Sequence, residues 1–205
     1  KNPVKLEHFV NISAMSYGSL SANAVSALNK GAGMAGILHN TGEGGFSSYH
    51  QKGGNVIFQL GTGKFGCRDD KGDFSDEAFA KIAAHDNVSM IELKLMQGAK
   101  PGKGGMLPKE KITSEIAAIR KVPMGKDILS PPRHNEFNDL AGMFDFIDRL
   151  RNLANKPVGI KIVVGHIEEI ENIAAAIALE PERGPDFISV DGGEGGTGAA
   201  PLVLA

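Results

Sequence analysis

Two lysines lie inside apolar stretches of the sequence, where a charged amine needs a specific partner. Lys94 stands in MIELKL (90–95) and Lys161 stands in GIKIVV (159–164). A buried charge is unstable without an opposite charge or a hydrogen-bonding partner. Each lysine can therefore pair with a nearby carboxylate, such as Glu92 for Lys94, or stabilise negative charge on a bound ligand. Lys161 is the better candidate for ligand chemistry.

A glycine-rich loop, GGEGGTGA (192–199), follows the last apolar strand pattern. Glycine lets the backbone turn its N–H groups towards an anion, and Thr197 adds a hydroxyl group. The end of the chain is therefore suited to holding a phosphate group.

Two further glycine loops contain charged residues suited to chemistry. NTGEGG (40–45) places Glu43 between glycines, and QGAKPGKGG (97–105) contains Lys100. The second loop is stiffened by proline, and its lysine is suited to binding a carboxylate. Solvated surface loops would also have this composition, so the motifs alone do not establish a site.

Composition and charge argue against several classes of protein. The 205 residues are 41% hydrophobic and 22% charged, with a formal net charge of −2. This balance gives no support to binding of nucleic acid or of a membrane surface. No apolar run approaches the length of a membrane span, and the start of the chain lacks the apolar core of a signal peptide. We therefore expect a cytoplasmic protein.

Metal and nucleophile chemistry is not supported by the reactive side chains. The six histidines have no metal-ligand spacing, so no metal site is predicted. Cys67 is the only cysteine and has no base beside it, which favours a structural thiol. The remaining glycines, amides and lysines suit a phosphorylated cofactor that carries its own chemistry.

Strand and helix patterns alternate along the chain, which is typical of an α/β fold. Seven apolar stretches predict strands, at 12–15, 36–39, 56–60, 90–95, 127–130, 158–164 and 187–190. Because polar and apolar residues alternate little within them, we expect a parallel sheet buried on both faces. Helical patterns lie between most of these stretches, at 21–30, 75–85, 110–120, 139–154 and 167–179.

The positions of the glycine loops favour a (β/α)₈ TIM barrel over a doubly wound sheet. A doubly wound sheet usually has its glycine motif after the first strand, but SAMSYGSLS (13–21) contains no such motif. The loops instead follow the second, third, fourth and seventh predicted strands, as at the mouth of a barrel. About 250 residues are typical of that barrel. We therefore expect one domain over 1–205 that lacks the last strand–helix unit.

Seven motifs in one order closely resemble those of the FMN-binding synthase domain of glutamate synthase. They are MSYGSLS (15–21), NTGEGG (40–45), QLGTGKFG (59–66), KLMQGAKPGKGG (94–105), LSPPRH (129–134), GIKIVV (159–164) and VDGGEGGTGAAPL (190–202). No single motif is decisive, but the ordered set is specific and runs from about residue 12 to the end. The resemblance implies a (β/α)₈ barrel with FMN across the mouths of its strands.

The resemblance also implies an activity. In that family, electrons reach the flavin and reduce 2-iminoglutarate, formed from 2-oxoglutarate and ammonia, to L-glutamate. The implied partners are therefore a small-molecule acid, ammonia, and an electron donor protein or reductase subunit. The implied catalytic residues are Lys161, Glu43 and Lys100, with Lys161 stabilising charge on the reduced flavin and Lys100 anchoring a substrate carboxylate.

The residues that match the family's cofactor and substrate positions are also implied by the resemblance. Gln59 and Lys161 would bond the pyrimidine edge of FMN, and the loop 192–198 would hold its ribityl and phosphate groups. The full cofactor set is Ala14, Met15, Ser16, Asn40, Thr41, Gln59, Lys94, Gln97, Lys161, Asp191, Gly192, Gly193, Gly195, Gly196, Thr197 and Gly198. The substrate set is Glu43, Lys100, Gly104, Gly105 and Met106.

The sequence departs from the family pattern in three ways. Met106 stands in GGMLP where the family pattern resembles GGQLP, and methionine cannot make the amide hydrogen bond expected near the 2-oxo acid. The cysteines of the expected iron–sulfur cluster and the amidotransferase domain are absent from these residues. The last strand is also missing, so we expect an oligomer or a further C-terminal segment to complete the barrel.

Two other functions stay open at this point. The first is a non-catalytic or partner-dependent barrel module for FMN, which keeps the fold, with or without the ligand, and turns nothing over alone. The second is another FMN barrel oxidoreductase that acts on a related amino or 2-oxo acid. Flavin content separates the first of these from an enzyme, and an assay with 2-oxoglutarate separates the second.

Overall fold

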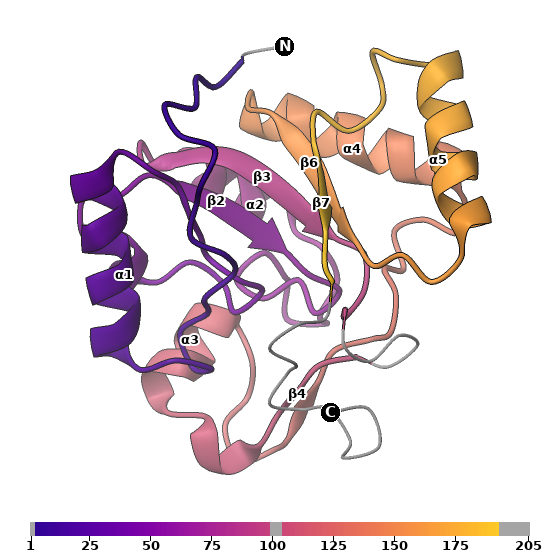
Figure 1. Ribbon diagram of the computed structural model, residues 1–205. Coiled ribbons are helices and arrows are strands. Elements are labelled where there is room, and N and C mark those ends of the chain that lie inside the picture. Colours follow the sequence, from indigo (N-terminus) through magenta and orange to yellow (C-terminus); the bar gives the residue numbers. More distant parts are fainter. Residues whose placement is uncertain (1–2, 99–103, 193–205) are drawn as a thin grey trace.

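The computed structural model describes residues 3–98 and 104–192, and its main feature is a parallel sheet (Figure 1). The strands lie in the order β1-β2-β3-β6-β7. Their bounds are β1 (His39–Asn40), β2 (Val56–Leu60), β3 (Val88–Lys94), β6 (Val158–Ile162) and β7 (Ile188–Val190). Every neighbouring pair in this sheet runs parallel, which confirms the predicted α/β class.

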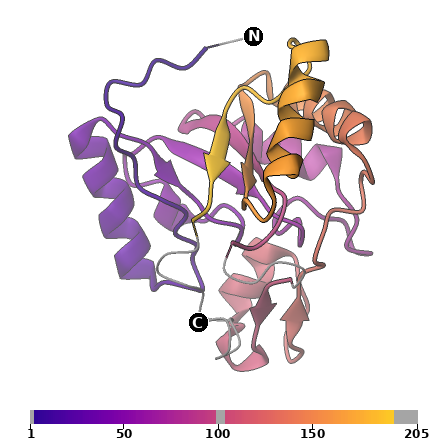
Figure 2. The same cartoon turned by 45° about the vertical axis from the view of Figure 1, so that its right-hand side comes forward.

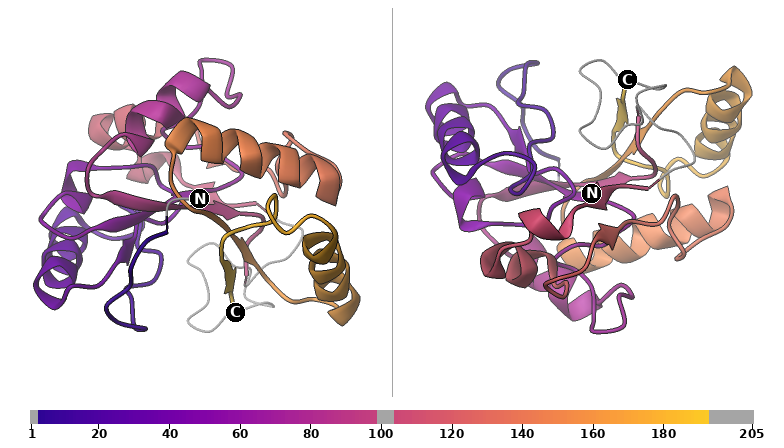
Figure 3. Two further views of the ribbon diagram at one scale, coloured as in Figure 1. Left: turned by 90° about the horizontal axis from the view of Figure 1, so that it is seen from above. Right: turned by 90° about the horizontal axis from the view of Figure 1, so that it is seen from below.

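The sheet is curled, and helices surround its outer side (Figure 3). Residues 12–15 lie beside β1 and extend the curve, although they form only an isolated parallel bridge from Ile12 to His39. Ile12 N donates a hydrogen bond to Leu38 O at 2.8 Å. The described residues therefore form a half-barrel, consistent with part of a TIM barrel.

Five helices lie among the described residues, close to the predicted ranges. They are α1 (Ala22–Ala35), α2 (Asp76–Ala83), α3 (Ser114–Arg120), α4 (Leu140–Ala154) and α5 (Ile167–Leu179). Side chains cap several of them: Ser21 accepts from Ala24 N at the start of α1, and Asp139 accepts from Gly142 N at the start of α4. No helix in these ranges is long and apolar enough to cross a membrane.

The main core lies between the sheet and helices α2 and α4. Phe58 of β2 and Ile91 of β3 are completely buried, together with Phe79 of α2 and Ile147 and Leu150 of α4. Burying each of these side chains contributes roughly 1.5–3 kcal/mol. This packing holds the central strands in place, and the carboxyl ends of those strands carry the candidate site.

The expectation that 127–130 is a barrel strand is wrong. Ile128–Leu129 forms β5, which pairs antiparallel with β4 (Met106–Leu107) in a separate two-stranded sheet. Within the main sheet, β3 pairs directly with β6. A short apolar run does not distinguish a barrel strand from a hairpin strand, so the pattern was ambiguous. The described main sheet has five strands and the bridge at 12–15, rather than seven strands.

Residues 104–138 form an excursion between β3 and β6, which includes β4, α3 and β5 and lies beneath the sheet in Figure 2. A second apolar cluster packs it against Phe65 from the loop after β2, with Leu107 and Ile116 among its buried members. His134 Nε2 also donates to Lys94 O at 2.9 Å, since a carbonyl oxygen can only accept. The excursion is thereby fixed against the carboxyl end of the sheet.

Candidate active site

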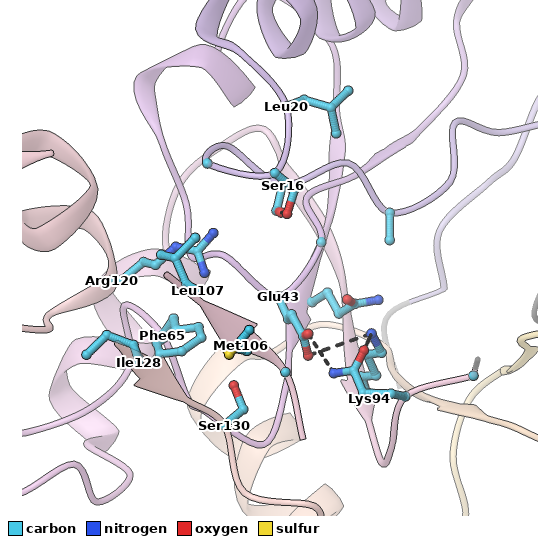
Figure 4. Close-up of a pocket in the computed structure, with 18 of the residues that line it drawn as sticks. Ser16, Leu20, Glu43, Phe65, Lys94, Met106, Leu107, Arg120, Ile128 and Ser130 are labelled. Atoms are coloured by element: carbon cyan, nitrogen blue, oxygen red, sulfur yellow. Dashed lines mark hydrogen bonds and ion pairs between the residues drawn. The ribbon is translucent and has the colours of Figure 1, made fainter. Parts of the chain in front are cut away.

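A cavity of about 460 Å³ lies where the excursion meets the carboxyl ends of β2, β3 and β6 (Figure 4). Its size is within the range of small-molecule pockets, about 300–1,000 Å³. Three parts line it: a backbone wall within residues 13–20, a polar group from the strand ends, and an apolar wall from the excursion. In parallel α/β folds, ligands bind at this end of the sheet.

Glu43, Lys94 and Gln97 form a connected polar cluster at the cavity. Figure 4 labels Glu43 and Lys94. Gln97 Nε2 donates to Glu43 Oε1 at 2.6 Å, and Lys94 Nζ donates to Gln97 Oε1 at 3.0 Å. Lys94 Nζ also lies 3.7 Å from Glu43 Oε2. The carboxylate beside Lys94 is therefore Glu43, and not Glu92, which was one of the alternatives that the sequence left open. Gly61 makes room for this carboxylate, because a Cβ there would lie 2.4 Å from Glu43 Oε2.

Lys161 and Lys94 are register partners on adjacent strands, so their side chains leave the sheet side by side. Lys161 Nζ forms an ion pair with Asp191 Oδ2 at 3.2 Å. Each lysine thus has one carboxylate, which reduces the repulsion between the two ammonium groups. Both lysines and Asp191 line the cavity. The lysines are candidates because of their apolar strands, and Asp191 is implied by the family resemblance. Two neighbouring cations of this kind suit a ligand that gains negative charge.

Gln59 lines the cavity and is nearly fully buried. Its Nε2 donates to Glu92 Oε1 at 2.6 Å, while its Oε1 has no hydrogen-bond partner among the described residues. A buried amide oxygen without a partner is costly, roughly 1–3 kcal/mol, unless a ligand donates to it. Gln59 therefore presents an acceptor for an N–H group of a bound molecule.

Glu92 was not predicted as a site residue, although it stands in the same apolar strand as Lys94. It is 2% exposed and accepts hydrogen bonds from Asn40 Nδ2 at 2.8 Å, Gln59 Nε2 at 2.6 Å and Ser189 Oγ at 2.6 Å. These donors come from β1, β2 and β7, so one carboxylate of β3 connects four strands. The signal in the sequence was an acid inside an apolar run.

The backbone wall of the cavity is built by residues 13–16, and Ser13, Ala14 and Ser16 line it. Met15 is bonded away from the cavity, because its N donates to Asn40 O at 3.0 Å and its O accepts from His50 Nε2 at 3.0 Å. The turn at Gly42 also contacts this wall, since a Cβ there would lie 2.9 Å from Ser16 N.

Asn40 and Thr41 support the cavity and are not among its lining residues. Asn40 Oδ1 accepts from Gly42 N at 3.0 Å, and Thr41 Oγ1 accepts from Gln59 N at 3.0 Å. Both predicted cofactor residues therefore hold the loop after β1 and the Gln59 backbone in position.

Arg120 lines the cavity and was missed by the sequence analysis. It is 5% exposed, its Nη2 donates to Tyr17 O at 3.0 Å, and its guanidinium lies 5.2 Å from the centre of the Phe65 ring. Its Nε has no hydrogen-bond partner among the described residues. Burial lowers the pKa of Arg120, and the charge of Glu43 opposes that shift. A buried guanidinium with a spare donor is suited to a ligand carboxylate.

The apolar wall lies on the Arg120 side of the cavity, away from Lys94 (Figure 4). Met106 is 51% exposed and lines the cavity with Phe65, Leu107 and Ile128. Gly105 also lines it, and Gly104 lies against Ser130, where no side chain would fit. The predicted substrate residues Glu43, Gly105 and Met106 are thus brought together at one cavity.

Several predicted residues lie outside the described ranges. They are Lys100, Gly193, Gly195, Gly196, Thr197 and Gly198. Gly192 is the last described residue and is not among those that line the cavity. Within residues 3–98 and 104–192, no group of His, Cys, Asp and Glu residues has the arrangement of a metal site.

The residues of the cavity fit the FMN that the sequence resemblance implies. The pyrimidine edge of an isoalloxazine carries an N–H group, which the unpaired Oε1 of Gln59 could accept. Reduced flavin carries negative charge, which Lys94 and Lys161 would stabilise. The small residues of the backbone wall leave room for a flat ring. The chemistry available to these side chains is therefore binding, charge stabilisation and proton exchange.

Known proteins resemble this chain along its whole length. Residues 1–205 match the family described as the conserved region in glutamate synthase. The glutamate synthase large subunit-like protein YerD of Bacillus subtilis (strain 168) is 47% identical over 207 residues, covering 100% of this chain and 39% of that protein. The archaeal-type NADPH glutamate synthase of Thermotoga sp. (strain RQ2) is 38% identical over 203 residues, covering 98% of this chain and 36% of that protein.

A third relative, the archaeal NADPH glutamate synthase of Archaeoglobus fulgidus, is 38% identical over 204 residues, covering 98% of this chain and 36% of that protein. The chain thus spans between 36% and 39% of the length of these relatives. Because the family match covers every residue, the chain belongs to the glutamate synthase family.

Proposed function

We propose that this chain is the flavin-binding part of an FMN-dependent oxidoreductase of the glutamate synthase type, which reduces 2-iminoglutarate to L-glutamate. The observation that carries the proposal is the convergence of Gln59, Lys94 and Lys161 on one cavity beside Glu43 and Arg120. When bound, the flavin supplies the transfer of electrons. The side chains of the chain bind and orient the reactants and exchange protons.

The cofactor is held from three sides in this proposal. Gln59 Oε1 accepts the N–H of the pyrimidine edge, and Lys161 favours negative charge at the adjacent part of the ring. Asp191, 3.2 Å from Lys161 Nζ, keeps that lysine at the cavity. The loop 192–198 binds the ribityl and phosphate groups through its backbone N–H groups.

The substrate lies between the polar cluster and the excursion in this proposal. Arg120 and Lys100 each bind a carboxylate of 2-oxoglutarate, which carries two such groups. Glu43 stands at the reacting end in this proposal, with its Oε2 3.7 Å from Lys94 Nζ and accepting no hydrogen bond among the described residues. That oxygen can hold a proton of ammonia or of the imine and return it during reduction.

The activity of the whole protein extends beyond these residues. We propose that other segments close the barrel, carry the iron–sulfur cluster of the family, and receive electrons from a donor protein or reductase subunit. The coverage supports this part of the proposal, since the chain spans at most 39% of the length of the relatives named above.

A second function is favoured by one observation, the exposed apolar side chain of Met106 at the cavity. Methionine fills irregular apolar space and offers no amide to a 2-oxo group. An FMN oxidoreductase that acts on a less polar amino or 2-oxo acid would use the same flavin site with this wall.

The test is a single-turnover experiment on the full-length protein with its flavin chemically reduced. Reoxidation by 2-oxoglutarate and ammonia, with formation of L-glutamate, would support the first function. Reoxidation only by a less polar 2-oxo acid with ammonia would support the second. A bound flavin that neither mixture reoxidises would identify a binding module and contradict both.

A further inference from the structure

Glu92 has a place in the fold that neither its strand nor the proposed reaction explains. It is 2% exposed, lies in β3 and accepts three hydrogen bonds, one of them from the cavity residue Gln59, but does not itself line the cavity. Holding strands together does not need a charged group, because backbone ladders already do so. The contact of interest is the one with Gln59.

The Gln59 amide has two orientations with nearly the same shape, and only one fits beside Glu92. An ionised carboxylate accepts hydrogen bonds and cannot donate them. Nε2 must therefore face Glu92 Oε1, where the distance is 2.6 Å, since Oε1 of Gln59 in that place would set two acceptors against each other. The remaining atom of the amide, Oε1, is then the one left for a ligand.

The neighbours of this contact restrict the amide further. Asn40 Nδ2 reaches the same Glu92 oxygen at 2.8 Å, and Asn40 Oδ1 is taken by Gly42 N at 3.0 Å. The Gln59 backbone N is held by Thr41 Oγ1 at 3.0 Å. Among the described residues, the one hydrogen bond that Gln59 Nε2 donates is the one to Glu92 Oε1.

We propose that Glu92 is a positioning residue that fixes the Gln59 amide with its oxygen available to the ligand, so that the cavity selects a molecule with an N–H donor at that point. The ligand class is one with an imide-type edge, and the choice of FMN as that ligand rests on the function proposed above. Glu92 does not itself touch the ligand.

The experiment compares binding of FMN and N3-methyl FMN, which lacks the N–H donor, to the flavin-free full-length protein by quenching of flavin fluorescence. The original protein should prefer FMN by about tenfold or more, the value of one lost hydrogen bond. Glu92→Gln should keep this preference, because its amide oxygen can still accept from Gln59 while its NH₂ donates to Ser189 Oγ. Glu92→Met should reduce the preference to near one, because the Gln59 amide can then turn.

Ser189→Ala is the matched control, since it removes one hydrogen bond of Glu92 and leaves Gln59 alone; it should keep the preference. Full preference in a folded Glu92→Met protein would overturn the inference. So would loss of preference in Glu92→Gln, which would make the charge of Glu92 the important property. Equal binding of both flavins by the original protein would overturn it as well.

Absence of FMN binding in the original protein would contradict the proposed function. The orientation of the Gln59 amide would then be tested by a second measurement, the exchange of its side-chain amide protons with solvent. Within residues 1–205 the glutamines are Gln51, Gln59 and Gln97, and in ¹⁵N-glutamine-labelled full-length protein the Gln59 side-chain signals are identified as those that disappear in Gln59→Leu. The side-chain amide protons of Gln59 should exchange slowly with solvent in the flavin-free protein and in Glu92→Gln. Fast exchange of the Gln59 amide protons in either of these two proteins would overturn the positioning role. This test depends neither on the ligand nor on whether Glu92→Met folds.

Discussion

Lys161 Nζ lies 3.2 Å from Asp191 Oδ2, and this ion pair joins the end of β6 to the residue that follows β7. It holds an ammonium group at the cavity next to that of Lys94, its register partner. A positive charge fixed in this way favours the reduced, negatively charged form of a flavin over the oxidised form.

Lys161→Met should therefore lower the reduction potential of the bound flavin. Loss of such a preorganised charge costs about 2.7–4 kcal/mol, or roughly 60–90 mV for a two-electron couple. Spectroscopic titration against a reference dye measures the shift, and Lys161→Arg should keep most of the original potential. An unchanged potential in Lys161→Met would leave Lys161 with a structural role only.

Arg120→Gln should weaken binding of 2-oxoglutarate to the flavin-loaded protein by about tenfold to a hundredfold. The guanidinium is buried at the cavity, and a hydrogen bond to a charged group is worth about 1.5–3 kcal/mol. Calorimetry or flavin difference spectra give the dissociation constant.

Arg149→Gln is the control for that measurement. Arg149 lies on α4 in a half-exposed ion pair with Asp76, 2.9 Å apart, and is not among the residues that line the cavity. Its loss should leave the dissociation constant unchanged. Equal effects of the two substitutions would remove Arg120 from the substrate site.

Met106→Gln should strengthen binding of 2-oxoglutarate by up to about tenfold, because the new amide can bond the oxo group. Met106→Leu keeps the apolar wall and should leave binding as it was. If Met106→Gln weakens binding or changes nothing, this position does not set the substrate. The reason for favouring a less polar acid would then disappear.

His39→Met should remove an acid-sensitive part of the stability. Both ring nitrogens of His39 lack hydrogen-bond partners among the described residues, and burial, followed by the charge of His50, lowers its pKa to about 4. The unfolded chain has the ordinary value near 6.5, so it takes up a proton first as the pH falls. The contribution of neutral His39 to the free energy of unfolding is therefore fully present above about pH 6.5. It is lost as the pH falls towards about 4, by up to about 3 kcal/mol.

Urea unfolding at pH 7.5 and pH 4.5 measures this difference. On acidification, His39→Met should lose less stability than the original protein. His8→Met changes an exposed position and should lose as much stability as the original protein. The same pH dependence in His39→Met and the original protein would show that His39 is not the responsible group.

Elements with strong local signals could be predicted from the sequence. Helix α5 has the bounds expected for it, and α4 begins one residue after the predicted start because Asp139 is its cap. The strand at 127–130 could not be assigned correctly, since its pairing with β4 depends on contacts distant in the sequence.

The site residues divide in the same way. Lys94, Lys161 and Gln59 stand at the ends of buried strands, where periodicity already directs attention. Arg120 stands at the end of a short helix and has the pattern of a surface cation. Its burial depends on residues distant in the sequence, among them Tyr17, Gly44 and Phe65. The sequence left the carboxylate beside Lys94 open, and Glu92 bonds to Asn40, Gln59 and Ser189 instead.

The central claim is that this cavity binds FMN, and flavin binding by the full-length protein tests it most directly. The account predicts one FMN for each chain, released on denaturation and identified by its mass. Gln59→Leu should weaken binding at least about tenfold, through loss of the acceptor for the ring N–H. A folded protein that neither retains FMN nor takes it up on titration would contradict the account.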